Sequence, residues 1–435
     1  MRLPFALLAV VLAGSFAFHA YRAEHPTSSY QSADERSYGA LALGLAERQS
    51  YDGARTALHW PPGAPVMFAL AHAVSPHPDS ERTRDIPAAY WAQALASLGT
   101  LLAAFGLAWA LAGMWAGVVA AALVGFYPPL ILATGEQVSE PLGAFLLTAG
   151  FCTLAWAAER RWLPGYALAG AVLGAAVLTR ADLLLVPFLV ALLCFGWLWR
   201  ARRDPRRGLA VGGLLAAGAL LAIGPWAAYA SLRADRLVPV TQGSAAPLFV
   251  GTYLPGKGHT VGMKRALEDE VKRFKPSVRD TPPFHIPAGH YMEMIAARHP
   301  DLPEDAAIRR EARENVRRYA LGDPLGFGVM MLDKVQRMWT RYARGGARHT
   351  SPWIRGWHVA LVLGCLAGLL AGLWRRRPVL LAAVLLAAAY STALHTIVIS
   401  QARYNLPLMP ILISAGVAGW FLWRRERERE PAEAP

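Results

Sequence analysis

The chain is poor in cysteine and in lysine, and the cysteine pattern excludes two kinds of protein. Cys152, Cys194 and Cys365 are the only cysteines in 435 residues, and all three lie inside apolar segments. None belongs to a Cys-x-x-Cys motif or has a histidine nearby. We therefore expect small core residues, and neither a disulfide framework nor a zinc site. Lysine supplies five of the 44 basic residues, a bias toward arginine that says little about mechanism.

Other features are also missing. The sequence has no internal repeat, parallel or inverted, whereas such repeats are typical of transporters. The histidines of segment 231–352 are scattered, without a carboxylate in register, which argues against a metal-binding outer domain. The net charge of +14 does not indicate a nucleic-acid partner, because the basic residues gather in short loops between apolar runs.

Long apolar runs, by contrast, are abundant. Hydrophobic residues make up 54% of the chain, and runs near 20 residues recur. About 20 residues cross the hydrocarbon core as a helix. The sequence therefore predicts an all-α polytopic membrane protein with about ten transmembrane helices. They lie near residues 3–20, 90–111, 114–132, 140–158, 164–180, 183–199, 208–230, 353–374, 378–399 and 405–423.

The short loops set the predicted orientation. Arginine clusters at 160–161, 200–207, 375–377 and 424–425 all fall on one side, which should be cytoplasmic. The stretch from Pro65 to Val74 is too short to cross and would reverse this pattern, so we expect an interfacial helix there. Residues 1–20 could be a signal peptide with Ser15 and Ala17 near its cleavage site, but an uncleaved first span is preferred because many spans follow. We expect a multi-pass protein of a bacterial cytoplasmic (inner) membrane, with its active site facing the periplasm or exterior.

This topology divides the chain into four parts. Residues 1–230 form an N-terminal transmembrane catalytic module, whose first extracytoplasmic loop, 21–89, bears interfacial helices. Residues 231–352 form a small extracytoplasmic subdomain, in which apolar residues recur at helical spacing in two stretches. Residues 353–423 are C-terminal transmembrane helices, and residues 424–435 are a charged cytoplasmic tail.

Ionisable side chains gather at the predicted outer ends of the spans. Such residues at membrane depth are costly and usually functional. Asp34 and Glu35 follow the first span, Glu140 opens another, and Arg403 opens the last. Arg180 and Asp182 occupy a tight outer turn, where a local ion pair is the plain alternative. A helix cap is the alternative for Asp34, and snorkelling to the interface is the alternative for Arg403.

These residue types suit transfer of a group from a phosphate. Asp34 could take a proton from an attacking hydroxyl as general base. Arg403, and Arg180 with it, could stabilise a phosphate leaving group. Glu140 could orient an acceptor or help to hold a divalent cation, which the sequence permits without requiring. No other cofactor is implied.

Several motifs together resemble the GT-C superfamily of polyprenyl-phosphate-sugar-dependent glycosyltransferases, in the branch of aminoarabinose-transferase-like enzymes and protein O-mannosyltransferases. They are Asp34-Glu35 with Tyr38, the turn 61–65 (Pro-Pro-Gly-Ala-Pro), residues 139–142 (Ser-Glu-Pro-Leu), residues 178–180 (Leu-Thr-Arg), and Arg403-Tyr404 followed by Pro407 and Pro410. The likeness covers about residues 1–230 and 353–423.

The resemblance implies that a sugar on a polyprenyl phosphate is transferred, with inversion, to an acceptor hydroxyl outside the cytoplasm. It implies that Asp34 is the catalytic base, that Glu140 is a second acid, and that Arg403 contacts the donor phosphate. Relatives often carry a basic residue just before the two prolines, where this chain has Trp60, with His59 one position earlier. His59 is therefore an open candidate for substrate binding, as are Tyr38, Arg180, Asp182 and Tyr404.

The acceptor remains open between a lipid, a polysaccharide and a protein, and the sugar is not specified. Two other classes are alternatives. A polytopic transporter or lipid-linked-sugar flippase would place its polar residues near the bilayer midplane. Another membrane transferase, such as a polymer ligase or a phosphoethanolamine-type enzyme, is the third.

Overall fold

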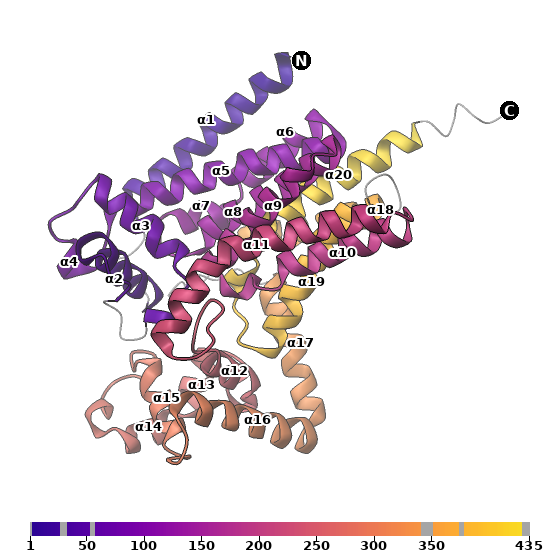
Figure 1. Cartoon of the computed structure of the whole chain (residues 1–435). Coiled ribbons are helices and arrows are strands. Elements are labelled where there is room, and N and C mark those ends of the chain that lie inside the picture. The colour runs from indigo at the N-terminus through magenta and orange to yellow at the C-terminus, as the bar shows by residue number, and fades with distance from the viewer. Residues whose placement is uncertain (1, 27–32, 53–56, 341–350, 374–377, 429–435) are drawn as a thin grey trace. The chain divides into compact units, whose positions relative to one another are not determined.

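The computed structural model describes residues 2–26, 33–52, 57–340, 351–373 and 378–428 (Figure 1). Within these ranges every regular element is a helix, and no strand occurs. The chain forms two compact units. The first comprises residues 1–241, 351–389 and 405–435, and the second comprises residues 242–350 and 390–404. The second unit therefore includes residues 390–404, which lie outside the predicted outer subdomain of residues 231–352.

In the part of the chain that the structure describes, seven helices are long and apolar enough to cross a membrane. They are α1 (Arg2–Glu24), α5 (Pro87–Ala112), α8 (Glu140–Arg160), α10 (Val186–Arg200) with the turn before it, α11 (Pro205–Ala234), α18 (Pro352–Leu373) and α19 (Pro378–Ile397). The prediction of an all-α polytopic membrane protein is confirmed, and the count of ten spans is approximate. The helices α9 (Leu163–Thr179) and α20 (Met409–Arg427) occupy two further predicted spans.

The predicted span 114–132 is wrong as a single helix. It consists of α6 (Met114–Gly125) and α7 (Pro128–Thr134), which meet at a bend of 54°. Pro128 and Pro129 open α7. Proline has no backbone N–H, and its ring clashes with the preceding turn, so the helix stops before the pair.

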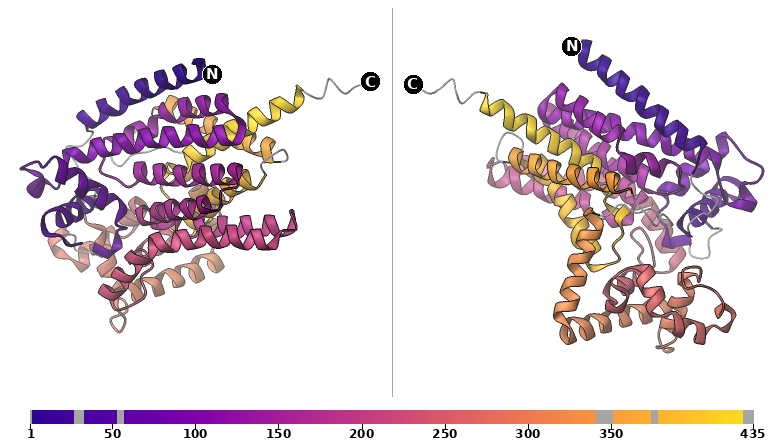
Figure 2. Two further views of the ribbon diagram at one scale, coloured as in Figure 1. Left: turned by 45° about the horizontal axis from the view of Figure 1, so that its top comes forward. Right: turned by 180° about the vertical axis from the view of Figure 1, so that it is seen from behind.

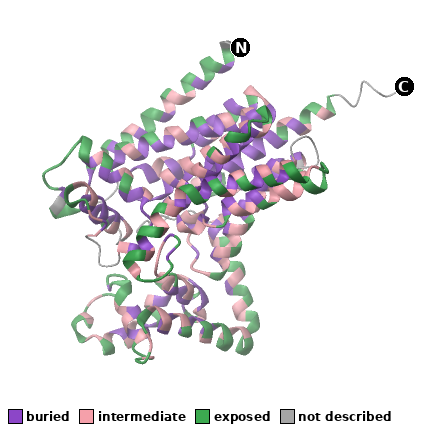
Figure 3. Cartoon of the chain, in the orientation of Figure 1, coloured by how far each residue is buried: buried purple, intermediate pink, exposed green. Residues whose placement is uncertain are grey.

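Small residues set the packing of the first unit. A Cβ on Gly170 of α9 would lie 2.8 Å from the Leu215 carbonyl carbon of α11, and one on Gly218 would lie 2.9 Å from the Ala167 carbonyl carbon. Only glycine permits backbones to approach so closely. Figure 2 shows α1 running along α5 at the edge of this bundle, and Figure 3 shows the buried faces turned into it.

The first loop forms a small helical layer of its own. It contains α2 (Ala33–Arg48), η1 (Ala57–His59), α3 (Gly63–Val74) and α4 (Ser80–Thr83). Twelve residues in α3 give about 18 Å of helix, which cannot cross a core of about 30 Å. Tyr38, Leu43, Phe68 and Ile86 join these helices in a common apolar core.

The second unit is a separate helical body. It contains α12 (Ala245–Thr252), α13 (Thr260–Ala266), α14 (Glu268–Phe274), α15 (Ala288–Ala296), α16 (Glu304–Gly322), α17 (Pro324–Thr340) and short 3-10 turns, η5 (Ala402–Asn405) among them. Its core is built around Phe249, Val271, Tyr291, Ile295 and Ile308.

Candidate active site

The two acids of the first loop have different surroundings. Both lie in the first turn of α2, where exposed backbone N–H groups and the helix dipole favour negative charge. Glu35 is only 4% exposed, and its Oε1 accepts a hydrogen bond from the backbone N–H of Gln137 at 3.3 Å. Asp34 is half-buried. The chain therefore anchors Glu35 to the loop before α8 and leaves its neighbour nearer the surface.

Tyr38 connects α2 to the start of α8. It lies one helical turn after Asp34, and its hydroxyl hydrogen-bonds to the side chain of Ser139. Its ring contacts Trp60 edge-on, with centroids 5.1 Å apart, and Phe68 at 6.5 Å. Burial, and next the charge of Asp34, raise the pKa of Tyr38 above its usual value, so the phenol stays neutral.

Glu140, Arg180 and Asp182 form one buried ion-pair network. Nη1 of Arg180 lies 3.2 Å from Oε1 of Glu140. The guanidinium also donates from Nε and Nη2 to the two carboxylate oxygens of Asp182, each at 3.2 Å. The local Arg–Asp pair considered from sequence exists, but it is part of a larger arrangement that reaches the first turn of α8.

Two glycines allow Arg180 to occupy this place. A Cβ on Gly143, one turn into α8, would lie 2.8 Å from Cδ of Arg180. The aliphatic part of the arginine side chain therefore packs directly on the helix backbone at this glycine. A Cβ on Gly63 would lie 2.8 Å from Cα of Thr179, the last residue of α9. The Pro-Pro-Gly turn therefore packs against the chain immediately before Arg180.

The remaining predicted residues belong to other elements. His59 is exposed on η1. Arg403 and Tyr404 belong to the second unit, on η5. Nε of Arg403 donates to Oε1 of Gln401 at 3.0 Å, and Tyr404 stacks on His395 with ring centroids 4.4 Å apart. The first unit brings together Asp34, Glu35, Tyr38, Glu140, Arg180 and Asp182.

Three further polar residues, absent from the sequence prediction, adjoin this group. The side-chain amide of Gln137 donates to Asp85, and to the hydroxyl of Tyr90 at 3.3 Å. That hydroxyl donates to Oδ1 of Asp85 at 2.8 Å. Asp85 lies just before α5, and Glu140 lies at the start of α8. The signal that identified Glu140, an ionisable residue at the predicted outer end of a span, would therefore also have identified Asp85.

An apolar cavity of about 1100 Å³ lies beside these residues in the first unit. Its walls come from α1, α3, α5, α8 and α9. Leu142 and Thr179 line it, and they stand two residues from Glu140 and one residue from Arg180 along the chain. Asp85 also lines it, so the cavity is apolar with polar groups at its margin.

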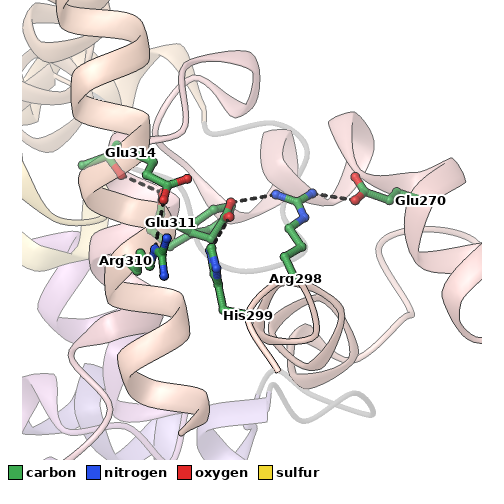
Figure 4. Close-up of polar contacts among 8 residues, drawn as sticks. Glu270, Arg298, His299, Arg310, Glu311 and Glu314 are labelled. Carbon is green, nitrogen blue, oxygen red and sulfur yellow. Dashed lines mark hydrogen bonds and ion pairs between the residues drawn. The ribbon is translucent and has the colours of Figure 1, made fainter. Parts of the chain in front are cut away.

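A different cluster lies in the second unit. Among the described residues, the one group of three or more potential ligands within 4.8 Å of one another is His299, Glu311 and Glu314 (Figure 4). Arg298 pairs with Glu311 at 2.8 Å, and Arg310 pairs with Glu314 at 3.2 Å. Two guanidinium groups already neutralise these carboxylates, so the cluster is an ion-pair network that ties α16 to the end of α15.

Comparison with solved structures finds a similar fold in the oligosaccharyltransferase AglB of Archaeoglobus fulgidus. AglB in complex with an inhibitory peptide and a dolichol-phosphate matches with a TM-score of 0.56 and 14% identity over 100% of this chain. AglB tethered to an acceptor peptide matches with a TM-score of 0.57 and 15% identity, also over 100%. The chain spans about half the length of AglB, 52% and 51% in the two matches.

ArnT of Cupriavidus metallidurans bound to undecaprenyl phosphate also matches, with 16% identity over 99% of this chain and 79% of ArnT, but its TM-score of 0.38 is too low to carry weight. No family model matches the sequence, and no curated protein does. At such identities the likeness to AglB shows the fold. The all-α membrane fold predicted from the sequence is therefore confirmed.

Proposed function

We propose that this protein is an integral membrane glycosyltransferase that moves a sugar from a polyprenyl-phosphate donor to an acceptor hydroxyl. The observation that carries the proposal is the position of a half-buried first-loop acid, Asp34, within a GT-C fold. Asp34 shares a helix face with Tyr38, whose partner Ser139 directly precedes the ion-paired Glu140. An apolar cavity adjoins these residues.

Asp34 is the proposed general base. It takes the proton of the acceptor hydroxyl while the hydroxyl oxygen bonds to the anomeric carbon. The bond from that carbon to the donor phosphate breaks, and attack from the opposite side inverts the configuration. Glu35 is the weaker candidate, because it already accepts a hydrogen bond from the Gln137 backbone. A positioned base typically contributes about 10²–10⁴-fold to the rate.

The leaving phosphate needs charge stabilisation more than a proton. We assign this role to Arg403, as the resemblance implies. Arg180 suits it less well, because Asp182 and Glu140 already occupy its three guanidinium nitrogens. In this proposal Arg180 is a positioning residue that holds Glu140 in place.

The apolar cavity is the proposed site for the first part of the donor's isoprenoid tail. Several lining residues, Val66, Leu70 and Leu95 among them, are also exposed at the surface. An apolar chain could therefore enter sideways from the bilayer. Dolichol-phosphate, which is bound in the AglB complex, is a lipid of this class.

The finer assignments belong to the same proposal. The active site faces away from the cytoplasm at a bacterial inner membrane, because the arginine-rich short loops then lie inside. The branch is that of aminoarabinose-transferase-like or protein O-mannosyltransferase-like enzymes, and the acceptor is a lipid, a polysaccharide or a protein.

The deciding experiment is mass spectrometry of the cell envelope with and without the gene. We expect one glycosyl mass to disappear and to return with the wild-type gene, but not with Asp34→Asn. Purified protein in proteoliposomes with a polyprenyl-phosphate sugar then separates transfer from transport. Movement of the donor between leaflets without a glycosylated product would favour the flippase alternative.

A further inference from the structure

Helix α17 in the second unit has its apolar and polar residues in unexpected places. Leu325, Val329 and Leu332 recur at the spacing that puts them on one face of a helix. A stripe of this kind normally faces the core. Here the three side chains are 79%, 50% and 70% exposed, and Leu321, at the end of α16, is 82% exposed. The stripe faces outward.

The opposite face of α17 carries the buried residues. Met330 and Met338 pack inward, and so does Lys334, whose side chain is fully buried. At 100° per residue Lys334 points about 180° away from Leu325. A helix in water would be expected to bury its leucines and to expose its lysine.

The lysine is held firmly in this orientation. Its Nζ donates to the carbonyl of Gly251 at 2.9 Å and to that of Ile397 at 3.3 Å, and the hydroxyl of Ser400 donates to its backbone carbonyl at 2.9 Å. At the start of the helix, Oδ1 of Asp323 accepts a hydrogen bond from the Gly326 N–H. The bonds of Lys334 and Ser400 to distant segments hold α17 in an orientation that leaves its apolar stripe outward.

The neighbouring residues indicate what covers the stripe. Arg317 and Arg318 are exposed near the end of α16, one turn before Leu321. Thr340, the last residue of α17, is twelve positions from Pro352, where α18 begins with the exposed Trp353. Tryptophan at a span end is typical of the membrane interface. Leucines flanked by arginines, so close along the chain to a span, suit acyl chains and anionic headgroups.

We propose that the outward stripe of α17, residues Leu325, Val329 and Leu332, rests in the outer interface of the bilayer together with Leu321 at the end of α16, and that Arg317 and Arg318 lie at the lipid headgroups. The second unit is then an interfacial body, held at the membrane by this helix as well as by the spans on either side of it. The inference depends on the protein being a membrane protein and does not depend on glycosyl transfer.

The test is the lipid exposure of single spin labels in the full-length protein. Cys152, Cys194 and Cys365 are replaced by alanine, and one cysteine is placed at Leu325, Val329 or Leu332. Each is labelled in nanodiscs of phosphatidylethanolamine and phosphatidylglycerol. The control label replaces Arg313, an exposed residue of α16. All four positions are at the surface, so the substitutions should not disturb folding.

We expect collision with oxygen to exceed collision with a water-soluble nickel chelate at the three stripe positions, and the reverse at Arg313. A preference for the nickel chelate on the stripe would overturn the proposal. So would labels reached by neither reagent, since these would indicate a protein partner or a second copy on the stripe. Failure of glycosyl transfer would leave the result unchanged, so the two proposals are tested separately.

Discussion

Nη1 of Arg180 lies 3.2 Å from Oε1 of Glu140, and both side chains are buried, at 7% and 5% exposure. The pair connects the end of α9 to the start of α8, and Asp182 completes the neutralisation of the guanidinium. Charges this deeply buried depend on one another, because removal of one member leaves the others without compensation.

The first prediction concerns this network. Arg180→Met should lower the free energy of unfolding by about 3–5 kcal/mol, since the buried carboxylate of Glu140 and the partly buried carboxylate of Asp182 lose their counter-charge. Denaturant unfolding in mild detergent measures the loss. The double variant Arg180→Met with Glu140→Gln should recover part of it. If the single and double variants were equally unstable, the pair would not be coupled.

The second prediction separates the two adjacent acids. Asp34→Asn should lower turnover roughly 100- to 10,000-fold, because the amide cannot accept the hydroxyl proton. Thermal stability should fall only slightly, because one favourable charge at the N-terminus of α2 is lost. Glu35→Gln is the matched control, since its amide oxygen can still accept the hydrogen bond from Gln137, and it should retain most of the activity. Near wild-type turnover by Asp34→Asn would remove the base role from this residue.

The third prediction concerns the donor phosphate. Arg403→Ala should reduce turnover roughly 100-fold with the lipid-linked sugar, because charge at the leaving phosphate goes unstabilised. Arg403→Lys keeps the positive charge but loses the planar pair of donors. Its turnover should therefore lie between that of the wild type and that of Arg403→Ala. Steady-state kinetics with varied donor measures both variants. An unchanged dependence on the donor would assign Arg403 to structure alone.

The fourth prediction concerns the Pro-Pro-Gly turn. Gly63→Ala should destabilise the protein by about 1–3 kcal/mol, because the new Cβ would meet the Thr179 backbone at 2.8 Å and force a shift. Activity should fall as well, since Thr179 precedes Arg180. Gly213→Ala is the control, because a Cβ there meets nothing within 4 Å. Equal melting temperatures for both variants would contradict the close approach.

The fifth prediction is a pH dependence. Burial, and next the charge of Arg337, lower the pKa of Lys334 to about 7. The unfolded chain keeps its proton up to about pH 10.4. Between these values the unfolded state binds more protons, so stability should rise with pH, by at most about 1.4 kcal/mol per unit.

Lys334→Met cannot titrate and serves as the reference. The melting temperature of the wild type minus that of the variant should increase from pH 7 to pH 10. Parallel curves for the two proteins would mean that Lys334 keeps an ordinary pKa in the folded state.

Local sequence was sufficient for most of the helices. Apolar runs near 20 residues predict spans because few other structures bury them, and each predicted span overlaps a helix. The break at residues 126–127 was missed, although Pro128 and Pro129 are visible in the sequence. The run of apolar residues predicts one continuous helix, but the two prolines lack backbone N–H donors and the first helix ends before them.

The site was predictable in part. Acids and arginines at span ends stand out because polar groups are scarce there, so Asp34, Glu35, Glu140 and Arg180 could be named. Of their partners, only Asp182, beside Arg180, could be named. Nothing in the sequence pairs Gln137 with Glu35 and Asp85, because that contact depends on how α2, α5 and α8 approach one another.

The amino-acid sequence by itself determined the helices, the division into apolar spans and polar loops, and the list of residues able to do chemistry, because these follow from composition and spacing along the chain. Only the tertiary structure decided which charges meet and which face of a helix is buried. It joined Arg180 to Glu140, and it turned Lys334 inward and Leu325 outward. Such choices depend on hydrogen bonds and backbone approaches between distant segments, which a linear pattern does not specify.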